Sequence, residues 1–244
     1  MNKYYDIRNK QDGVEILLYG DIAHDEWGKW TQEDTCPGDI VKALKEAGGK
    51  PLTVRINSGG GSVFGGMAIY NVLKGYAGKK TVYVDGIAAS IASVIMLAGD
   101  EIYVPKNAYV MIHKPWGSVW GGSAKDMRAY ADSLDVCEKG MMAVYSDHLA
   151  AGETLEHVQE LVDDETWMTG EEAAKIFTVT AGAPTEAVAC AGEALDHYGS
   201  APKGVKRARD EPEQKNKPQQ PDNSALDLAR AFCFVQKERS ETHE

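Results

Sequence analysis

The sequence lacks the cysteine patterns that metal clusters and disulfide scaffolds require. Its 244 residues include four cysteines, which are widely separated and never in C-x-x-C spacing: Cys36, Cys137, Cys190 and Cys233. Without such spacing, reduced thiols in a reducing compartment are the default expectation. We therefore expect no metal site and no cofactor in this chain.

The chain also has no long hydrophobic run and no surplus of positive charge. The apolar stretch at 86–98 is shorter than the ~18 residues that a membrane-spanning helix needs, and the polar start at 1–13 does not resemble a signal peptide. The formal net charge is −11, which argues against a nucleic-acid-binding surface. These absences predict a soluble cytoplasmic protein that binds neither membranes nor nucleic acid.

Large apolar side chains are nearly absent from 201–222, a segment that holds four of the nine prolines. Such a segment cannot bury enough surface to offset the entropy cost of ordering the chain. We therefore predict a folded domain at 1–182, a disordered linker at 183–222 and a C-terminal tail at 223–244. The tail contains one possible short helix, which is interpreted either as a frayed end or as a docking peptide.

The first 180 residues, in contrast, alternate between strand and helix patterns. Runs of strand-forming residues predict strands at 14–20, 52–57 and 80–86, and a pair of short strands around a turn within 101–113. Apolar residues at helical spacing predict helices at 38–48, 62–76, 123–149 and 155–162. Thr169 and Glu172 form the capping-box pattern of a further helix start. This alternation predicts an α/β domain.

A buried helix is also predicted within 86–99, GIAASIASVIMLAG, with its start at about Ser90. A hydroxyl in a core needs a hydrogen-bond partner, so a serine at this position calls for an explanation. The free N–H groups at a helix start favour developing negative charge, and the small residues before Ser90 leave room for a substrate backbone. Ser90 is therefore a candidate nucleophile.

Partners for this hydroxyl occur elsewhere in the chain. The turn 57–62, NSGGGS, has neither the GxxxxGK[ST] nor the GxGxxG pattern of a phosphate loop, so its glycines better suit an oxyanion hole. His113 ends a strand-like stretch, from which an imidazole can reach a neighbouring turn. The carboxylates that could orient this histidine are clustered: Asp163, Asp164 and Glu165.

Three ordered motifs resemble those of the ClpP-type serine peptidases. They are I-N-S-x-G-G at 56–61, G-x-A-A-S at 86–90 and the histidine of MIHKPWG at 111–117. The resemblance extends over about 14–177. The segments GIAASIASVIMLAGD and ETWMTGEEA are most similar to the ClpP-like proteases of tailed bacteriophages and prophages, which act in head maturation.

The resemblance implies a role for each candidate site residue. Ser90 would be the nucleophile, His113 its general base, and the N–H groups of Gly60 and Ile91 the oxyanion hole. Glu165 would be the third catalytic member, at a position where the housekeeping enzymes carry aspartate, with Asp164 as the fallback. Ser93 lies outside the motif and is expected to be a packing residue.

Two departures from the family pattern stand close to these motifs. The turn has Gly59 where the family usually has proline, which loosens it without removing its N–H groups. The closing G-L-x-D motif of the family is missing, and IFTVTAGAP stands in its place. The second departure affects the expected fold only at its edge, near 177–185. It does not affect the assignment of Ser90 or His113.

The resemblance also implies a ClpP/crotonase-like spiral of ββα units with a protruding handle, which the loop 117–122 and the helix 123–149 match by position. Family members form rings, commonly of seven subunits stacked in pairs, so we expect a homo-oligomer that acts on proteins or peptides. For the head maturation subgroup the substrates would be capsid or scaffold proteins, in the host cytoplasm or within procapsids. The apolar handle residues are expected to divide between the core and an inter-ring interface: Met127, Tyr130, Leu134, Met141, Met142 and Tyr145.

Two other functions compete with the peptidase hypothesis. A crotonase-type acyl-CoA enzyme would share the fold and the oxyanion hole, but it has no need of a serine and histidine pair. A non-enzymatic capsid-assembly component would instead use the tail at 201–244 as its interaction element.

Overall fold

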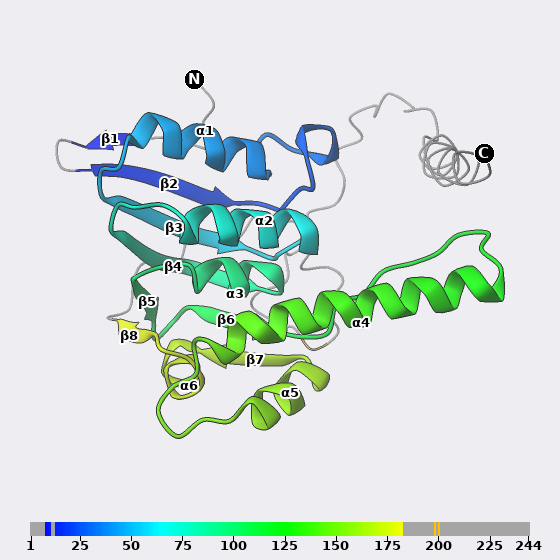
Figure 1. Ribbon diagram of the computed structural model, residues 1–244. Coiled ribbons are helices and arrows are strands. Elements are labelled where there is room, and N and C mark those ends of the chain that lie inside the picture. Colours follow the sequence, from blue (N-terminus) through cyan, green and yellow to red (C-terminus); the bar gives the residue numbers. More distant parts are fainter. Residues whose placement is uncertain (1–7, 11–12, 183–197, 199, 201–244) are drawn as a thin grey trace, which may run out of the picture. The chain divides into compact units, whose positions relative to one another are not determined.

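The computed structural model describes residues 8–10, 13–182, 198 and 200. Its centre is an eight-stranded sheet in the order β1-β2-β3-β4-β5-β8, with β6 beside β4 and β7 beside β6. Figure 1 shows these strands side by side. Their bounds are β1 (Arg8–Lys10), β2 (Gly13–Tyr19), β3 (Leu52–Ser58), β4 (Lys80–Ala89), β5 (Glu101–Pro105), β6 (Tyr109–Ile112), β7 (Thr166–Thr169) and β8 (Thr180–Gly182).

Three helices lie along one face of the sheet, as Figure 1 shows: α1 (Pro37–Ala47), α2 (Val63–Lys74) and α3 (Ile91–Met96). The apolar residues of this face and of the helices form one buried cluster. Beyond them follow α4 (Ala124–Ser146), α5 (Leu155–Asp163) and α6 (Gly170–Ile176), and a short 3-10 helix, η1 (Glu26–Gly28), precedes α1. No helix in the described part of the chain has the length and hydropathy of a membrane span.

The central strands β2, β3, β4 and β5 pair in parallel. A parallel pair needs a crossover connection, and α1, α2 and α3 provide those connections here. This arrangement confirms the predicted α/β class. Three strands were not predicted, namely β1, β7 and β8. Of these, β7 pairs antiparallel with β6, and only one of its four residues is buried, so it carries little sequence signal.

An irregularity in β4 directs the chain toward the site. The register between β3 and β4 shifts between Ile56 and Ser58, so that three residues of β4 lie opposite Asn57 alone. The Asn57 side chain fills this gap by accepting a hydrogen bond from the Ile87 N–H at 3.2 Å. Such bulges bend the strand that carries the extra residues. The first part of β4 consequently pairs with β5 and its last three residues pair with β6.

The helix predicted at 123–149 is α4, and its two halves differ in burial. Met141, Met142 and Tyr145 near its end are buried in the core. Met127 and Tyr130 near its start are exposed, although both are apolar. The buried members of this set are therefore core residues as expected, whereas the inter-ring interface expected for the exposed members stays a prediction.

The predicted linker and tail are described at only two positions. Tyr198 and Ser200 belong to the range 183–222, and Tyr198 is buried rather than solvated. The remainder of that range beyond Gly182 and all of 223–244, including the predicted short helix, lie outside the described residues.

Candidate active site

Ser90 lies at the junction between β4 and α3, where it is the N-cap residue of the helix. Its backbone has φ 54° and ψ −128°, a conformation that residues other than glycine rarely adopt. The Ser90 N–H donates to the Met111 carbonyl at 2.9 Å, which ties this turn to β6. Strained backbone of this kind persists where the surrounding structure enforces it, and it is concentrated at functional sites.

His113 directly follows β6, and its ring reaches the Ser90 hydroxyl. The His113 Nε2 and Ser90 Oγ atoms are 2.8 Å apart, within hydrogen-bond distance. The pairing of Ala89 with Met111 brings the ends of β4 and β6 together, which places the two side chains on neighbouring strand ends. The expected approach of the histidine to the serine is therefore present in the structure.

The environment of His113 favours its neutral form. Only 5% of the residue is exposed, and this burial lowers its pKa below the ordinary value of 6.5. The negative charge of Glu165 acts in the opposite direction and raises the pKa. A neutral imidazole can accept a proton from a hydroxyl, so the burial of His113 suits a general base near neutral pH.

The three candidate carboxylates have different surroundings. Glu165, whose φ is 50°, accepts hydrogen bonds from the Ser200 N–H at 3.1 Å and from the Ser200 hydroxyl at 2.5 Å. Among the described residues no hydrogen bond joins Glu165 to His113, so its effect on the imidazole is electrostatic. Asp163 forms an ion pair with Lys114 at 2.9 Å, and Asp164 is exposed at the end of α5.

A pocket of about 350 Å³ lies beside His113 and is bordered by two of these carboxylates, Asp163 and Glu165. Its lining combines aromatic, basic and acidic side chains: His113, Lys114, Pro115, Trp116, Asp163, Glu165 and Tyr198. The pocket borders the imidazole directly. It therefore offers space for part of a substrate next to the reactive pair.

The glycine turn lies against Ser90 as expected. A Cβ atom on Gly60 would approach the Ser90 Cβ to 2.7 Å, and Gly60 has φ +100°, so only glycine fits here without strain. The Gly60 N–H donates to the Ser58 hydroxyl at 3.2 Å. Ile91 is the first residue of α3, where a backbone N–H has no partner within the helix.

Ser93 has a structural environment, in agreement with its expected packing role. It is fully buried one turn beyond Ser90, and its hydroxyl donates to the Ser90 carbonyl at 2.6 Å. The same hydroxyl is 2.8 Å from the Tyr145 hydroxyl of α4. Ser93 thus joins α3 to α4.

Sequence reasoning did not anticipate Tyr198 and Ser200 near the site. The Tyr198 ring stands edge-on to the His113 imidazole, with 5.1 Å between ring centroids. Ser200 hydrogen-bonds to Glu165 as described above. Both residues follow an alanine-rich, proline-containing stretch, and nothing in that stretch signals that the chain returns to the site.

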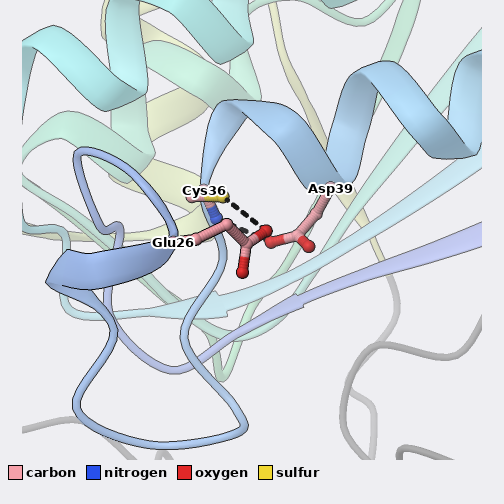
Figure 2. Close-up of side chains that lie close together, drawn as sticks. All are labelled: Glu26, Cys36 and Asp39. Carbon is pink, nitrogen blue, oxygen red and sulfur yellow. Dashed lines mark hydrogen bonds between the residues drawn. The ribbon is translucent and has the colours of Figure 1, made fainter.

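A cluster of potential metal ligands joins η1 to the start of α1, and Figure 2 shows its three members, Glu26, Cys36 and Asp39. The Cys36 thiol contacts Glu26 at 3.3 Å, and the Cys36 N–H donates to Asp39 at 2.9 Å (Figure 2). The Lys29 ammonium lies 2.6 Å from Asp39 and 3.1 Å from Glu26. Because Lys29 pairs with both carboxylates and Asp39 caps α1, the cluster is explained by ion pairs and a helix cap.

Comparison with known proteins agrees with this geometry. The family model described as Clp protease matches residues 25–178, more than half of the chain. The chain is 33% identical over 138 residues to the ATP-dependent Clp protease proteolytic subunit 2 of Thermobifida fusca, covering 56% of this chain and 66% of the relative. It is 35% identical over 130 residues to the ATP-dependent Clp protease proteolytic subunit 1 of Chlamydia abortus, covering 51% and 66% respectively.

A third relative, the ATP-dependent Clp protease proteolytic subunit of Porphyromonas gingivalis, is 33% identical over 150 residues, which cover 59% of this chain and 66% of the relative. The chain thus spans slightly less than two thirds of the length of each of these relatives. The family match includes the glycine turn, Ser90, His113 and Glu165. On this evidence the chain belongs to the Clp protease family.

Proposed function

We propose that the protein is a serine peptidase that hydrolyses peptide bonds in protein substrates. The observation that carries this proposal is the 2.8 Å contact between the Ser90 hydroxyl and His113 Nε2. Membership of the Clp protease family supports the same activity. A crotonase-type acyl-CoA reaction does not require a hydroxyl that is hydrogen-bonded to an imidazole.

In the proposed reaction, Ser90 Oγ attacks the carbonyl carbon of the substrate while its proton moves to His113 Nε2. The tetrahedral intermediate then collapses, its C–N bond breaks, and His113 gives the proton to the leaving amine. A water molecule next attacks the acyl ester and transfers a proton to His113. Release of the acid returns a proton to the Ser90 oxygen and regenerates the enzyme.

The negative oxygen of each intermediate would be bound by the N–H groups of Ile91 and Gly60. Ile91 presents its N–H at the start of α3, where the helix dipole adds to the stabilisation. The Gly60 N–H would have to exchange its long bond to Ser58 for the oxyanion. Glu165 would stabilise the imidazolium that forms on His113, since its charge already favours that form.

Hydrolysis of an unfolded protein tests the proposed function. We expect the purified full-length chain to degrade casein to peptides, detected by mass spectrometry, and to leave short-chain acyl-CoA thioesters intact. A serine peptidase needs both the nucleophile and the base, whereas a crotonase-type acyl-CoA enzyme uses the oxyanion hole without the pair of Ser90 and His113. Thioester turnover without any casein cleavage would contradict the proposal and favour the crotonase alternative.

The pH dependence of the reaction should reveal which carboxylate acts on His113. Only neutral His113 can serve as the base, so activity is expected to fall as the pH drops through its pKa, at a point below 6.5. Glu165 raises this pKa, so Glu165→Gln should move the acid limb of the kcat/KM profile to still lower pH and reduce kcat. The measurement is a pH profile of peptide hydrolysis.

Two neighbouring carboxylates offer matched controls for this prediction. Asp163→Asn removes a charge that is already paired with Lys114, and Asp164→Asn removes an exposed charge. Neither change should move the acid limb. If Asp164→Asn shifted the profile and Glu165→Gln did not, Asp164 rather than Glu165 would be the carboxylate that acts on His113.

We further propose that the chain assembles into rings of about seven subunits, stacked in pairs, and acts in phage or prophage head maturation on capsid or scaffold proteins. The exposed apolar residues of α4 support an assembly surface. The similarity of the segment 86–100 to the head maturation proteases supports the assignment to that subgroup. Native mass spectrometry measures the assembly. Proheads incubated with the protein would show cleaved capsid or scaffold chains if this role is correct.

A further inference from the structure

Tyr198 covers the Ser90 and His113 pair, although no step of the proposed reaction uses it. Its ring contacts the His113 ring edge-on and lies 6.1 Å from the Trp167 ring. Only 3% of Tyr198 is exposed, because it packs into a small apolar cluster: Ile87, Ala89 and Met111, with Tyr109 and Trp167 beside them. Tyr198 also forms one wall of the pocket beside His113.

The Tyr198 hydroxyl lies between the proposed nucleophile and the glycine turn. It donates a hydrogen bond to the Gly59 carbonyl at 2.6 Å. Burial raises the pKa of Tyr198 to about 12, while a hydrogen bond with Ser90 acts to lower it. The neutral phenol is therefore bound to the turn, beside His113 and close to Ser90. A scissile carbonyl has to occupy this same space to be attacked and stabilised.

The hydrogen bond to Gly59 also fixes the direction of the next N–H group. In a trans peptide unit the carbonyl and the N–H point in opposite directions. With the Gly59 carbonyl held by Tyr198, the Gly60 N–H points away from the phenol and donates to Ser58. One of the two proposed oxyanion donors is therefore engaged while Tyr198 is in place.

Ser200 provides a second attachment of the same stretch of chain. Its N–H and hydroxyl both donate to the Glu165 carboxylate, and its hydroxyl also lies 3.2 Å from the Glu165 carbonyl. Glu165 is the charge that acts on His113. Tyr198 and Ser200 thus bind at two members of the proposed machinery, one at the turn and one at the acid.

We propose that Tyr198 is an internal inhibitory anchor, which occupies the reactive end of the active site until a substrate displaces it. This inference rests on the proposed function, because it takes Ser90 as the nucleophile. The site that Tyr198 fills is an aromatic subsite, so peptides with an aromatic side chain are the class of ligand that competes with it. Tyr198 presents a phenol oxygen to Ser90 rather than a peptide carbonyl, so it acts as an inhibitor and not as a substrate.

The rate at which a fluorophosphonate probe labels the full-length chain tests this inference. Tyr198→Phe keeps the ring but loses the hydrogen bond to Gly59, and we expect labelling to accelerate about threefold to tenfold, the effect of one net hydrogen bond. Tyr198→Ala also loses the ring contacts and should accelerate labelling by about 30-fold or more. Tyr76→Phe is the control, since its hydroxyl donates to the Lys50 carbonyl at 2.7 Å on the surface.

Equal labelling rates in wild type and both Tyr198 variants would overturn the inference. Slower labelling in Tyr198→Phe would also overturn it and make Tyr198 a positioning residue for His113. Cleavage of the wild-type chain near Tyr198, seen by intact mass spectrometry, would show a substrate instead of an inhibitor.

A binding measurement separates failure of this inference from failure of the proposed function. In a Ser90→Ala background, N-acetyl-tyrosinamide should bind more tightly when Tyr198→Ala is added, because the aromatic subsite is then free. Equal binding would overturn the inhibitory anchor whatever the chemistry of Ser90. If no variant is labelled but the difference in binding persists, Ser90 is not the nucleophile. The inference that Tyr198 occupies an aromatic subsite is then still supported.

Discussion

Ser90→Ala should abolish both peptide hydrolysis and fluorophosphonate labelling. Without the hydroxyl there is no nucleophile for His113 to activate, and the 2.8 Å contact is lost. Removal of the nucleophile from a serine, histidine and acid unit lowers kcat by roughly five to six orders of magnitude. Peptide mapping of the labelled wild-type protein should place the probe on Ser90 alone.

Ser93→Ala is the matched control, because it removes a buried hydroxyl from the same helix. It leaves the Tyr145 hydroxyl without its Ser93 partner, so we expect a loss of about 1–3 kcal/mol in the free energy of unfolding. Labelling at Ser90 should nevertheless persist. Robust hydrolysis by the Ser90→Ala variant, or labelling that depends on Ser93 instead, would contradict the proposed mechanism.

Gly66→Ala should destabilise the protein despite the higher helix propensity of alanine. Gly66 lies in α2, where a Cβ atom would come within 2.1 Å of the Ile91 Cγ1 atom. Ile91 is fully buried and β-branched, so it cannot move aside without disturbing the start of α3. Overpacking of this kind costs about 1–3 kcal/mol, to be measured by urea unfolding. Because Ile91 carries a proposed oxyanion donor, kcat should fall as well.

Gly140→Ala serves as the comparison, since it makes the same change inside α4. The nearest atom to its added Cβ would be the Met67 Cε at 3.9 Å, an ordinary contact. Helix propensity should then dominate and stabilise the protein by about 0.5–1 kcal/mol. Equal stabilisation by both substitutions would show that α2 and α3 are not as closely packed as the structure indicates.

The strands and long helices were predictable because their apolar residues repeat at the period of the element. Each predicted strand between 14 and 113 and each predicted helix between 38 and 162 corresponds to an element of the structure, with bounds that differ by a few residues. Parallel strands flanked by Gly-rich turns also made the meeting of Ser90 and His113 predictable. Their catalytic roles remain predictions until the variants above are assayed.

Other features of the site could not be predicted, for identifiable physical reasons. The positive φ of Ser90 and of Glu165 is imposed by the surrounding structure, and neither serine nor glutamate is a residue type that indicates such a conformation. The hydrogen bonds between Glu165 and Ser200 join residues 35 positions apart, and local sequence patterns do not report contacts over such a separation. Tyr198 is a single aromatic residue in a polar context, so its burial depends wholly on tertiary contacts.

The uneven burial of α4 has a consequence for local opening. Its first half contributes exposed side chains, whereas Met141, Met142, Val144 and Tyr145 anchor the last turns. Figure 1 shows the first half extending past the end of the sheet. Backbone amides there can exchange with deuterium after fraying of a few turns, while those near Tyr145 exchange only when the core opens. A single continuous helix thus spans two regimes of hydrogen exchange.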